Sequence, residues 1–254
     1  MQPAIPEFAL VTGGAKRLGR AIALELARAG WGIVLHYRSS QAEAMDTAQD
    51  IRALGVPCIP VQADLESTVE VDALFDAAEA AGRVRCVVNN ASLFEFDSCQ
   101  QFDAALFNRH MASNLSAPIQ LAKRLHAAVP AGEHGVVVNL LDQKLKNLNP
   151  DFLSYTLTKA GLETATTLLA MELAPRVRVV GVAPGLTLIS HLQSPEQFEK
   201  THRISPLNKS SEPQDIARTV LFLVQSPAIT GSAVWVDGGQ HLVPMARDFS
   251  LMNP

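Results

Sequence analysis

The sequence predicts an α/β protein of the doubly wound type, with a seven-stranded parallel sheet and helices on both of its faces. Seven short apolar runs alternate with longer segments of helical periodicity along the 254 residues, which is the pattern of successive βαβ units. The runs are continuously apolar, as expected for parallel strands that are covered on both faces. Seven strands and six helices fill the chain, so we expect one domain over residues 1–254.

The expected strands and helices follow one another in a regular order. We expect strands at 8–14, 32–38, 58–64, 85–91, 135–142, 178–185 and 233–239. The helices are expected between them, at 18–29, 41–54, 67–81, 101–129, 151–174 and 213–225.

The segment 186–211 breaks this alternation, because it contains Pro195 and Pro206 and mixes apolar with polar residues. A segment of this length in a compact domain is usually functional, and we interpret it as a substrate loop or lid. The tail, 240–254, is apolar for an exposed end. We expect it either to pack in a subunit interface or to cover the site.

Composition excludes several classes of function. The chain is 48% hydrophobic and 18% charged, with a net charge of −4 and no basic face, which argues against a nucleic-acid partner. No apolar run reaches the roughly 18 residues of a membrane span, and Pro3, Pro6 and Glu7 interrupt any signal-peptide pattern. We therefore expect a cytoplasmic protein that does not cross a membrane.

The cysteines and histidines show no metal-binding spacing. The three cysteines, Cys58, Cys86 and Cys99, are interpreted as reduced thiols, with Cys86 in the core. His36 and His191 have no second ligand at helical spacing, so no metal is expected.

The turn after the first strand, TGGAKRLGR (12–20), has the features of a phosphate-binding loop. Gly13 and Gly14 permit a tight turn, and Gly19 lets the following helix pack close to the strand. The start of that helix offers free N–H groups and a positive dipole end to a pyrophosphate, as in Rossmann-type domains. An ordinary glycine-rich turn is the alternative, since the motif is not GxGxxG.

The second strand indicates which dinucleotide is bound. An NAD site usually has an acidic residue there, whereas this chain has HYRSS (36–40). Arg38 and Arg17 can approach a 2′-phosphate, and Ser39 and Ser40 can donate to it. We therefore predict NADP(H), although Arg38 can also be a solvated surface charge. Asp64 is expected either to accept from the adenine amino group or to begin a helix.

The expected catalytic pair is Tyr155 and Lys159, which share one helical face. An ammonium beside a phenol is expected to lower the pKa of the phenol, which suits a general acid. Tyr-xxx-Lys is common by chance, but Asp142 and PGLT (184–187) end neighbouring strands at the edge where α/β sheets bind ligands.

Along nearly its whole length the chain resembles the short-chain dehydrogenase/reductase family. The resemblance is carried by TGGAKRLG, NNAS (89–92), Asn114, Tyr155-xxx-Lys159, PGLT and the closing VDGG (236–239). It implies a tyrosine proton donor, a lysine on the nicotinamide ribose, and an asparagine that supports the lysine through water. It also implies a tetramer or dimer formed through residues 101–129 and 151–174.

The resemblance implies a cofactor site with carboxamide contacts at Thr187 and its neighbours. Its expected members are Gly13, Arg17, Leu18, Gly19, His36, Tyr37, Arg38, Ser39, Asp64, Leu65, Asn90, Ala91, Ser92, Tyr155, Lys159, Pro184, Gly185, Leu186 and Thr187.

Two departures from the family pattern narrow the resemblance. Arg17 stands where most members have glycine, and Asp142 where most have serine, thirteen residues before the tyrosine. With HYRSS, these departures resemble the pteridine reductase and dihydromonapterin reductase branch. That branch implies an arginine on cofactor phosphate and substrate, an Asp142–Tyr155 pair that delivers the proton, Phe94 stacked on the pterin opposite the nicotinamide, and Ser92 in the same slot.

Asp142 fits poorly with a simple ketone reductase. A serine donates to a carbonyl oxygen, whereas an ionised aspartate cannot donate and repels a developing oxyanion. Asp142 suits the N–H donors of a pterin, or a protonated acid that feeds a ring nitrogen, and it should titrate together with Tyr155. The alternatives are a structural acid paired with Lys144 or Lys146, a core or lid role for Phe94, and a helix hydrogen bond for Asn114.

The leading hypothesis is an NADPH-dependent reduction of the C=N bond of a dihydropterin, such as dihydrobiopterin, dihydromonapterin or dihydrofolate. One alternative is a reductase of the same family that acts on a ketone, 3-oxoacyl or sugar carbonyl. The other is a non-catalytic NADP-sensing regulatory protein, against which Asn114, Tyr155 and Lys159 together argue.

Overall fold

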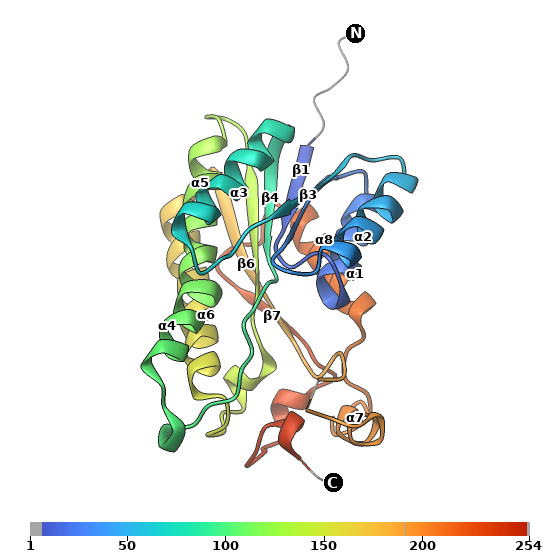
Figure 1. The fold of residues 1–254 in the computed structure, drawn as a ribbon, viewed down its shortest axis with the longest axis vertical. Helices are drawn as coiled ribbons and strands as arrows, with labels where there is room; N and C mark the ends of the chain where they lie inside the picture. The colour runs from blue at the N-terminus through green and yellow to red at the C-terminus, as the bar shows by residue number, and fades with distance from the viewer. Residues whose placement is uncertain (1–6, 191, 253–254) are drawn as a thin grey trace.

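The computed structural model describes residues 7–190 and 192–252 and contains the expected seven-stranded parallel sheet (Figure 1). The strand order is β3-β2-β1-β4-β5-β6-β7. Chain order therefore reverses between β1 and β4, which places a crevice at their carboxyl ends. The strands are β1 (Glu7–Val11), β2 (Gly32–Tyr37), β3 (Cys58–Gln62), β4 (Arg83–Asn89), β5 (Gly135–Leu140), β6 (Val177–Pro184) and β7 (Ala233–Val236).

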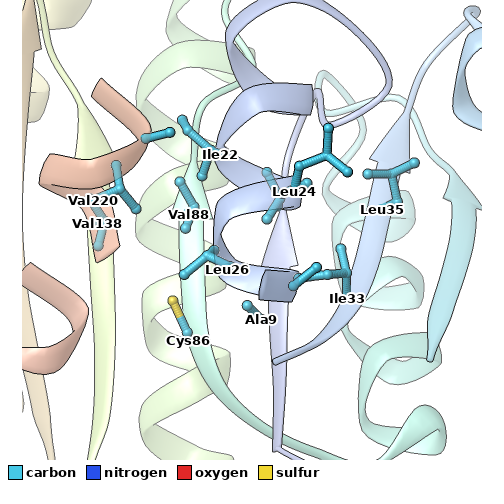
Figure 2. Packing of buried hydrophobic residues seen from close by; sticks show 14 of the residues in the cluster. Ala9, Ile22, Leu24, Leu26, Ile33, Leu35, Cys86, Val88, Val138 and Val220 are labelled. Carbon is cyan, nitrogen blue, oxygen red and sulfur yellow. The ribbon is translucent and has the colours of Figure 1, made fainter. Parts of the chain in front are cut away.

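Helices cover both faces of the sheet, as Figure 1 shows. One face carries α1 (Arg17–Arg28), α2 (Gln41–Ala53) and α8 (Pro213–Gln225), and the other carries α3 (Thr68–Ala81), α5 (Ala117–Ala128) and α6 (Leu153–Leu173), with α4 (Ala104–Met111) beside α6. Each face has its own apolar core. Figure 2 shows Ile22 and Leu26 of α1 packed over Ala9 and Val88 of the central strands.

Two segments differ from the expected pattern. Residues 101–129 are not one helix, because a π-helical turn, Ala112–Ser116, separates α4 from α5. The segment 186–211 contains a short helix, α7 (Pro195–His202), whose start is fixed by reciprocal capping between Ser194 and Gln197. Helix α7 and the C-terminal segment both lie beyond the carboxyl ends of the strands, at the bottom of Figure 1.

Over the described ranges, no helix has the length and apolar character needed to span a membrane. Across the same ranges, no cluster of three or more His, Cys, Asp and Glu side chains is placed to bind a metal ion. Pro3, Pro6, His191, Asn253 and Pro254, which the sequence analysis included, lie outside the described residues. Cys86 is fully buried in the core, as expected, and burial raises its thiol pKa to about 12.

Candidate active site

The loop between β1 and α1 leaves room for a phosphate group. Gly13 has a positive φ of 61°, and a Cβ at Gly19 would overlap the carbonyl oxygen of Gly13. Thr12 fixes this loop to the segment after β4, since its hydroxyl accepts from the Asn90 N–H at 3.0 Å. The Asn90 amide returns a hydrogen bond to the Thr12 carbonyl at 2.9 Å. The backbone therefore approaches any ligand at this turn without intervening side chains.

The first cavity, of about 420 Å³, opens in front of this loop. Its lining includes three cations, Lys16, Arg17 and Arg38, which suits an additional phosphate. Together with the glycine turn, these cations fit NADP(H). The lining residues are Gly13, Lys16, Arg17, Leu18, Gly19, His36, Arg38, Asp64, Leu65, Asn90, Ala91, Ser92, Leu93 and Ser113.

Three of the expected cofactor residues, His36, Tyr37 and Ser39, are not placed as simple cofactor contacts. His36 is buried, its Nδ1 accepts from the Gly13 N–H at 3.0 Å, and burial lowers its pKa, so a neutral ring supports the loop. Tyr37 packs in the apolar core, and neither it nor Ser39 lines the cavity. The sequence HYRSS therefore marks the right region of the chain. Because successive side chains point to opposite sides of an extended segment, only His36 and Arg38 of the four predicted residues, 36–39, line the cavity.

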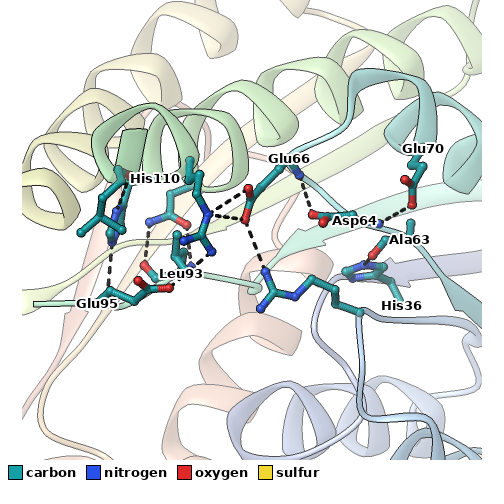
Figure 3. A network of polar contacts seen from close by, with 12 residues as sticks. His36, Ala63, Asp64, Glu66, Glu70, Leu93, Glu95 and His110 are labelled. Carbon is teal, nitrogen blue, oxygen red and sulfur yellow. Dashed lines mark hydrogen bonds and ion pairs between the residues drawn. The ribbon is translucent and has the colours of Figure 1, made fainter. Parts of the chain in front are cut away.

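A polar network lies on the side of this cavity formed by Arg38 and Asp64 (Figure 3). The Asp64 carboxylate accepts from the Glu66 N–H at 2.9 Å and begins a turn, but it does not begin a helix as one alternative proposed, because the N-cap of α3 is Ser67. Glu66 in turn pairs with Arg109 at 3.1 Å and with Arg38 at 3.4 Å. Arg38 is about half exposed, with its guanidinium held by one weak ion pair, and it is free to turn toward a phosphate.

A second cavity, of about 280 Å³, adjoins the first and shares Arg17, Leu18, Asn90 and Ser92 with it. The expected catalytic residues Asp142, Tyr155 and Lys159 all line it. The remaining lining residues are Phe94, Leu140, Leu141, Gln143, Pro184, Gly185, Leu186, Thr187, Leu188, Ser190, Asp248, Phe249 and Ser250.

Asp142, which is partly buried, and Tyr155, which is buried, form a hydrogen-bonded pair in this cavity. The Tyr155 hydroxyl donates to Asp142 Oδ2 at 2.6 Å, and Asp142 Oδ1 accepts from the Lys144 N–H at 2.8 Å. Burial raises the pKa of Asp142. The ammonium groups of Lys144 and Lys146 pair elsewhere, with Asp248 and Glu163 respectively, so Asp142 is not the structural partner of either.

One electrostatic expectation was wrong. Lys159 was expected to lower the pKa of Tyr155, but burial and the adjacent Asp142 carboxylate raise it well above its ordinary value. Lys159 Nζ lies 5.6 Å from the Tyr155 ring centre and donates to the Leu140 carbonyl at 2.7 Å. Burial lowers the Lys159 pKa to about 8. Tyr155 therefore stays a protonated donor, held by Asp142.

Asn114 lies at the π-helical turn and connects two parts of the site. Its side chain accepts from the Leu93 N–H at 2.7 Å and donates to the Leu93 carbonyl at 2.9 Å. It also donates to the Thr158 hydroxyl at 3.2 Å, one residue before Lys159. Asn114 thus holds the segment after β4 against α6 and does not contact Lys159 directly.

Phe94 lines the second cavity and is held by two aromatic neighbours. Its ring stacks on the fully buried Phe152, with centroids 4.2 Å apart and planes 17° apart. Its centroid also lies 4.8 Å from that of Tyr155, at 83°. Asp97, which follows on the same segment, accepts from the Ser154 N–H at 3.0 Å and ties Phe94 to the start of α6.

The chain's own C-terminal segment closes the second cavity through Asp248, Phe249 and Ser250. Of the two expectations for the tail, covering the site is the one that this geometry matches. Sequence reasoning did not identify these three residues or Gln143, and only the proximity of Gln143 to Asp142 offered a signal. The segment after β6 is held on the other side by Arg17, whose guanidinium donates to the Ile189 carbonyl at 2.7 Å.

The fold and the two adjoining cavities define an oxidoreductase of the dinucleotide-dependent class. A family profile described as enoyl-(acyl carrier protein) reductase matches residues 13–241. The 3-oxoacyl-[acyl-carrier-protein] reductase FabG of Staphylococcus epidermidis is 30% identical over 92% of this chain and 98% of its own length. The chain therefore belongs to the short-chain dehydrogenase/reductase family.

Two solved structures are more similar in sequence. FolM alternative dihydrofolate reductase 1 of Brucella suis is 42% identical to this chain, with a TM-score of 0.89. The match covers 96% of this chain and 97% of the Brucella suis chain. The Brucella canis protein is also 42% identical, with a TM-score of 0.87 and coverage of 94% and 95%. Both are complexes with NADP, in agreement with the NADP(H) cofactor expected from the sequence.

Proposed function

We propose that this protein is an NADPH-dependent reductase of the C=N bond of a dihydropterin. One observation carries the proposal: the carboxyl of Asp142 hydrogen-bonds the Tyr155 hydroxyl at 2.6 Å in the cavity that adjoins the dinucleotide cleft. The similarity to the two dihydrofolate reductases of Brucella supports a pterin or folate-like substrate.

Bound NADPH supplies the hydride, and the chain supplies the proton and the orientation. Reduction of C=N adds a hydride to carbon and a proton to nitrogen. Tyr155 is the proton donor, since its raised pKa keeps it protonated at neutral pH. The proton is replaced through Asp142, whose raised pKa brings its titration closer to neutrality. The two groups therefore act as a coupled pair.

The surrounding residues orient the substrate and exclude water. Phe94 offers one face of its ring to a flat heterocycle, while Phe152 supports the other face. Ser92 and Arg17 line both cavities and bridge the cofactor and substrate ends. The segment 186–211 and the C-terminal segment form the outer wall, and we propose that they act as the lid.

The ketone alternative rests on the similarity to FabG. It has an electrostatic difficulty, because an Asp142 carboxylate beside the hydroxyl of Tyr155 repels the negative charge that develops on a carbonyl oxygen. The nitrogen of a C=N bond is basic enough to take its proton from the pair before the hydride arrives, and then no negative charge has to develop on it.

The proposal is tested by a substrate panel with the purified protein. NADPH oxidation is measured with dihydrobiopterin, dihydromonapterin and dihydrofolate, and with a 3-oxoacyl ester and a cyclic ketone. We expect turnover with at least one dihydropterin and little with the ketones. Turnover of a ketone without turnover of any dihydropterin would overturn the proposal in favour of the alternative.

A further inference from the structure

We propose that the side-chain amide of Gln143 binds the amino-pyrimidinone edge of the substrate and selects pterins over carbonyl compounds. This inference rests on the proposed function and assigns a specificity-determining group to the same site. It concerns the residue that follows Asp142 and precedes Lys144 in the turn after β5.

Gln143 is held in place on both sides. Asp142 accepts from the Lys144 N–H at 2.8 Å and from Tyr155, which fixes the turn that Gln143 begins. The Lys144 ammonium is buried, and it donates to the Asp151 carbonyl and to Asp248 at 3.1 Å. The backbone at 143 is thereby fixed between two anchored neighbours, and Gln143 is one of the residues that line the second cavity.

The Gln143 side chain has an unused hydrogen-bonding group in this wall. The residue is only 7% exposed. Within residues 7–190 and 192–252 its Oε1 has no hydrogen-bond partner. Buried polar atoms in folded proteins are nearly always paired, and an exception at a ligand cavity indicates a group that a ligand completes. Of the three such side-chain atoms in these ranges, the one on Gln143 belongs to a residue that lines the same cavity as Asp142 and Tyr155.

An amide is complementary to one of the two candidate substrate classes. It carries an acceptor and a donor side by side, and a half-turn of its last bond exchanges them. The amino-pyrimidinone edge of a pterin likewise presents N–H donors next to an acceptor. A ketone presents an acceptor alone and leaves the Gln143 oxygen unpaired, which disfavours its binding.

Binding to the oxidised-cofactor complex tests the inference without turnover. Protein saturated with NADP⁺ is titrated by calorimetry with dihydrobiopterin and with the matching 6-substituted dihydrolumazine, in which an oxygen replaces the 2-amino group. The proteins compared are wild type, Gln143→Met, which keeps side-chain length without the amide, and Gln49→Met on the exposed face of α2 as a matched control.

We expect wild type and Gln49→Met to prefer the amino compound, and Gln143→Met to bind it about 10- to 100-fold more weakly and to lose the preference. The melting temperature of Gln143→Met should be unchanged or higher, because an unpaired buried oxygen is removed. If Gln143→Met binds each compound with the same affinity as wild type does, this inference is overturned and the proposed function still stands. If wild type binds neither compound, the proposed function is overturned as well.

Discussion

At the scale of single residues, three titratable side chains share one corner of the second cavity. Asp142 has a raised pKa, Tyr155 a strongly raised one, and Lys159 a pKa lowered to about 8. In each case burial is the largest cause, because it disfavours the charged form. Burial therefore favours the neutral form of each group, and the pKa of Lys159 lies closest to the physiological range.

The lowered pKa of Lys159 predicts how activity depends on pH. Below about pH 8 the side chain is an ammonium, and above it the charge is lost. We expect kcat for dihydropterin reduction to fall as the pH rises through about 8. Lys159→Arg, which stays charged, should show a lower rate without this fall. A wild-type profile that stays flat from pH 7 to well above 9 would contradict the assignment.

The lowered pKa of Lys159 also makes the free energy of unfolding depend on pH. The folded-state pKa of Lys159 lies below its ordinary 10.5, so the folded protein binds fewer protons than the unfolded chain between about pH 8 and that value. The cost of burying the ammonium is fully present below about pH 8 and is relieved as the pH rises above it.

Arg17 combines a strained backbone with a functional side chain. Its φ of 54° lies in the left-handed region, where a residue other than glycine costs on the order of 1 kcal/mol. We expect both Arg17→Gly and Arg17→Ala to bind NADPH at least about tenfold more weakly, because a charged hydrogen bond is lost. Only Arg17→Gly relieves the strain, so urea unfolding should show it to be about 1 kcal/mol more stable than Arg17→Ala. Equal stability of the two variants would refute the strain argument.

At the scale of elements, the C-terminal segment is held over the cavity by contacts from two loops. Asp151 accepts from Arg247 at 2.8 Å and from the Asp248 N–H at 2.8 Å, and Gln193 donates to the Phe249 carbonyl at 3.0 Å. The Lys144–Asp248 ion pair lies beneath them, with Lys144 2% exposed. The C-terminal segment is therefore fixed to the rest of the fold by specific hydrogen bonds and an ion pair.

Breaking this ion pair should destabilise the protein. Asp248→Ala leaves the buried Lys144 ammonium with the Asp151 carbonyl as its remaining partner, which should cost about 3 kcal/mol. Adding Lys144→Met should recover most of that loss, because the uncompensated charge is removed. Denaturant unfolding of the two single variants and the double variant measures the coupling. Additive losses would mean that the pair does not act as a unit.

The sequence predicts whole elements better than their interruptions. The strands were predicted to within a few residues, because short continuous apolar runs are typical of parallel strands that are buried on both faces. The π-helical turn that presents Asn114 was missed, since a one-residue insertion leaves helical periodicity almost unchanged. Helix α7 was missed although Ser194 and Gln197 have the spacing of a capping box. The tail contacts join residues that are 56 to 104 positions apart, which no local pattern encodes.

At the scale of the whole molecule, the sheet order brings the cofactor and substrate ends together. The reversal between β1 and β4 places the glycine loop, the segment after β4 and the end of β5 around one crevice. This arrangement follows from the alternation of strands and helices, and so the cofactor site was more predictable than the substrate wall.

NADPH should stabilise the whole fold more than NADH does. At a concentration of 100 Kd, a ligand that binds only the folded state adds about 2.7 kcal/mol. For a domain of this size that corresponds to a rise of roughly 5–10 °C in melting temperature. NADH at the same concentration should give a smaller rise, and Arg38→Ala should reduce the difference. Equal shifts for the two dinucleotides in wild type would contradict the role given to Arg38.

The most direct measurement of the central claim is the substrate preference of Asp142→Ser. Steady-state rates with NADPH are compared for wild type and variant, on a dihydropterin and on a ketone. If the carboxyl at 142 serves proton delivery to a ring nitrogen, the variant loses dihydropterin turnover by about 100-fold or more and keeps or gains ketone reduction. Dihydropterin turnover that survives the substitution unchanged would contradict the account.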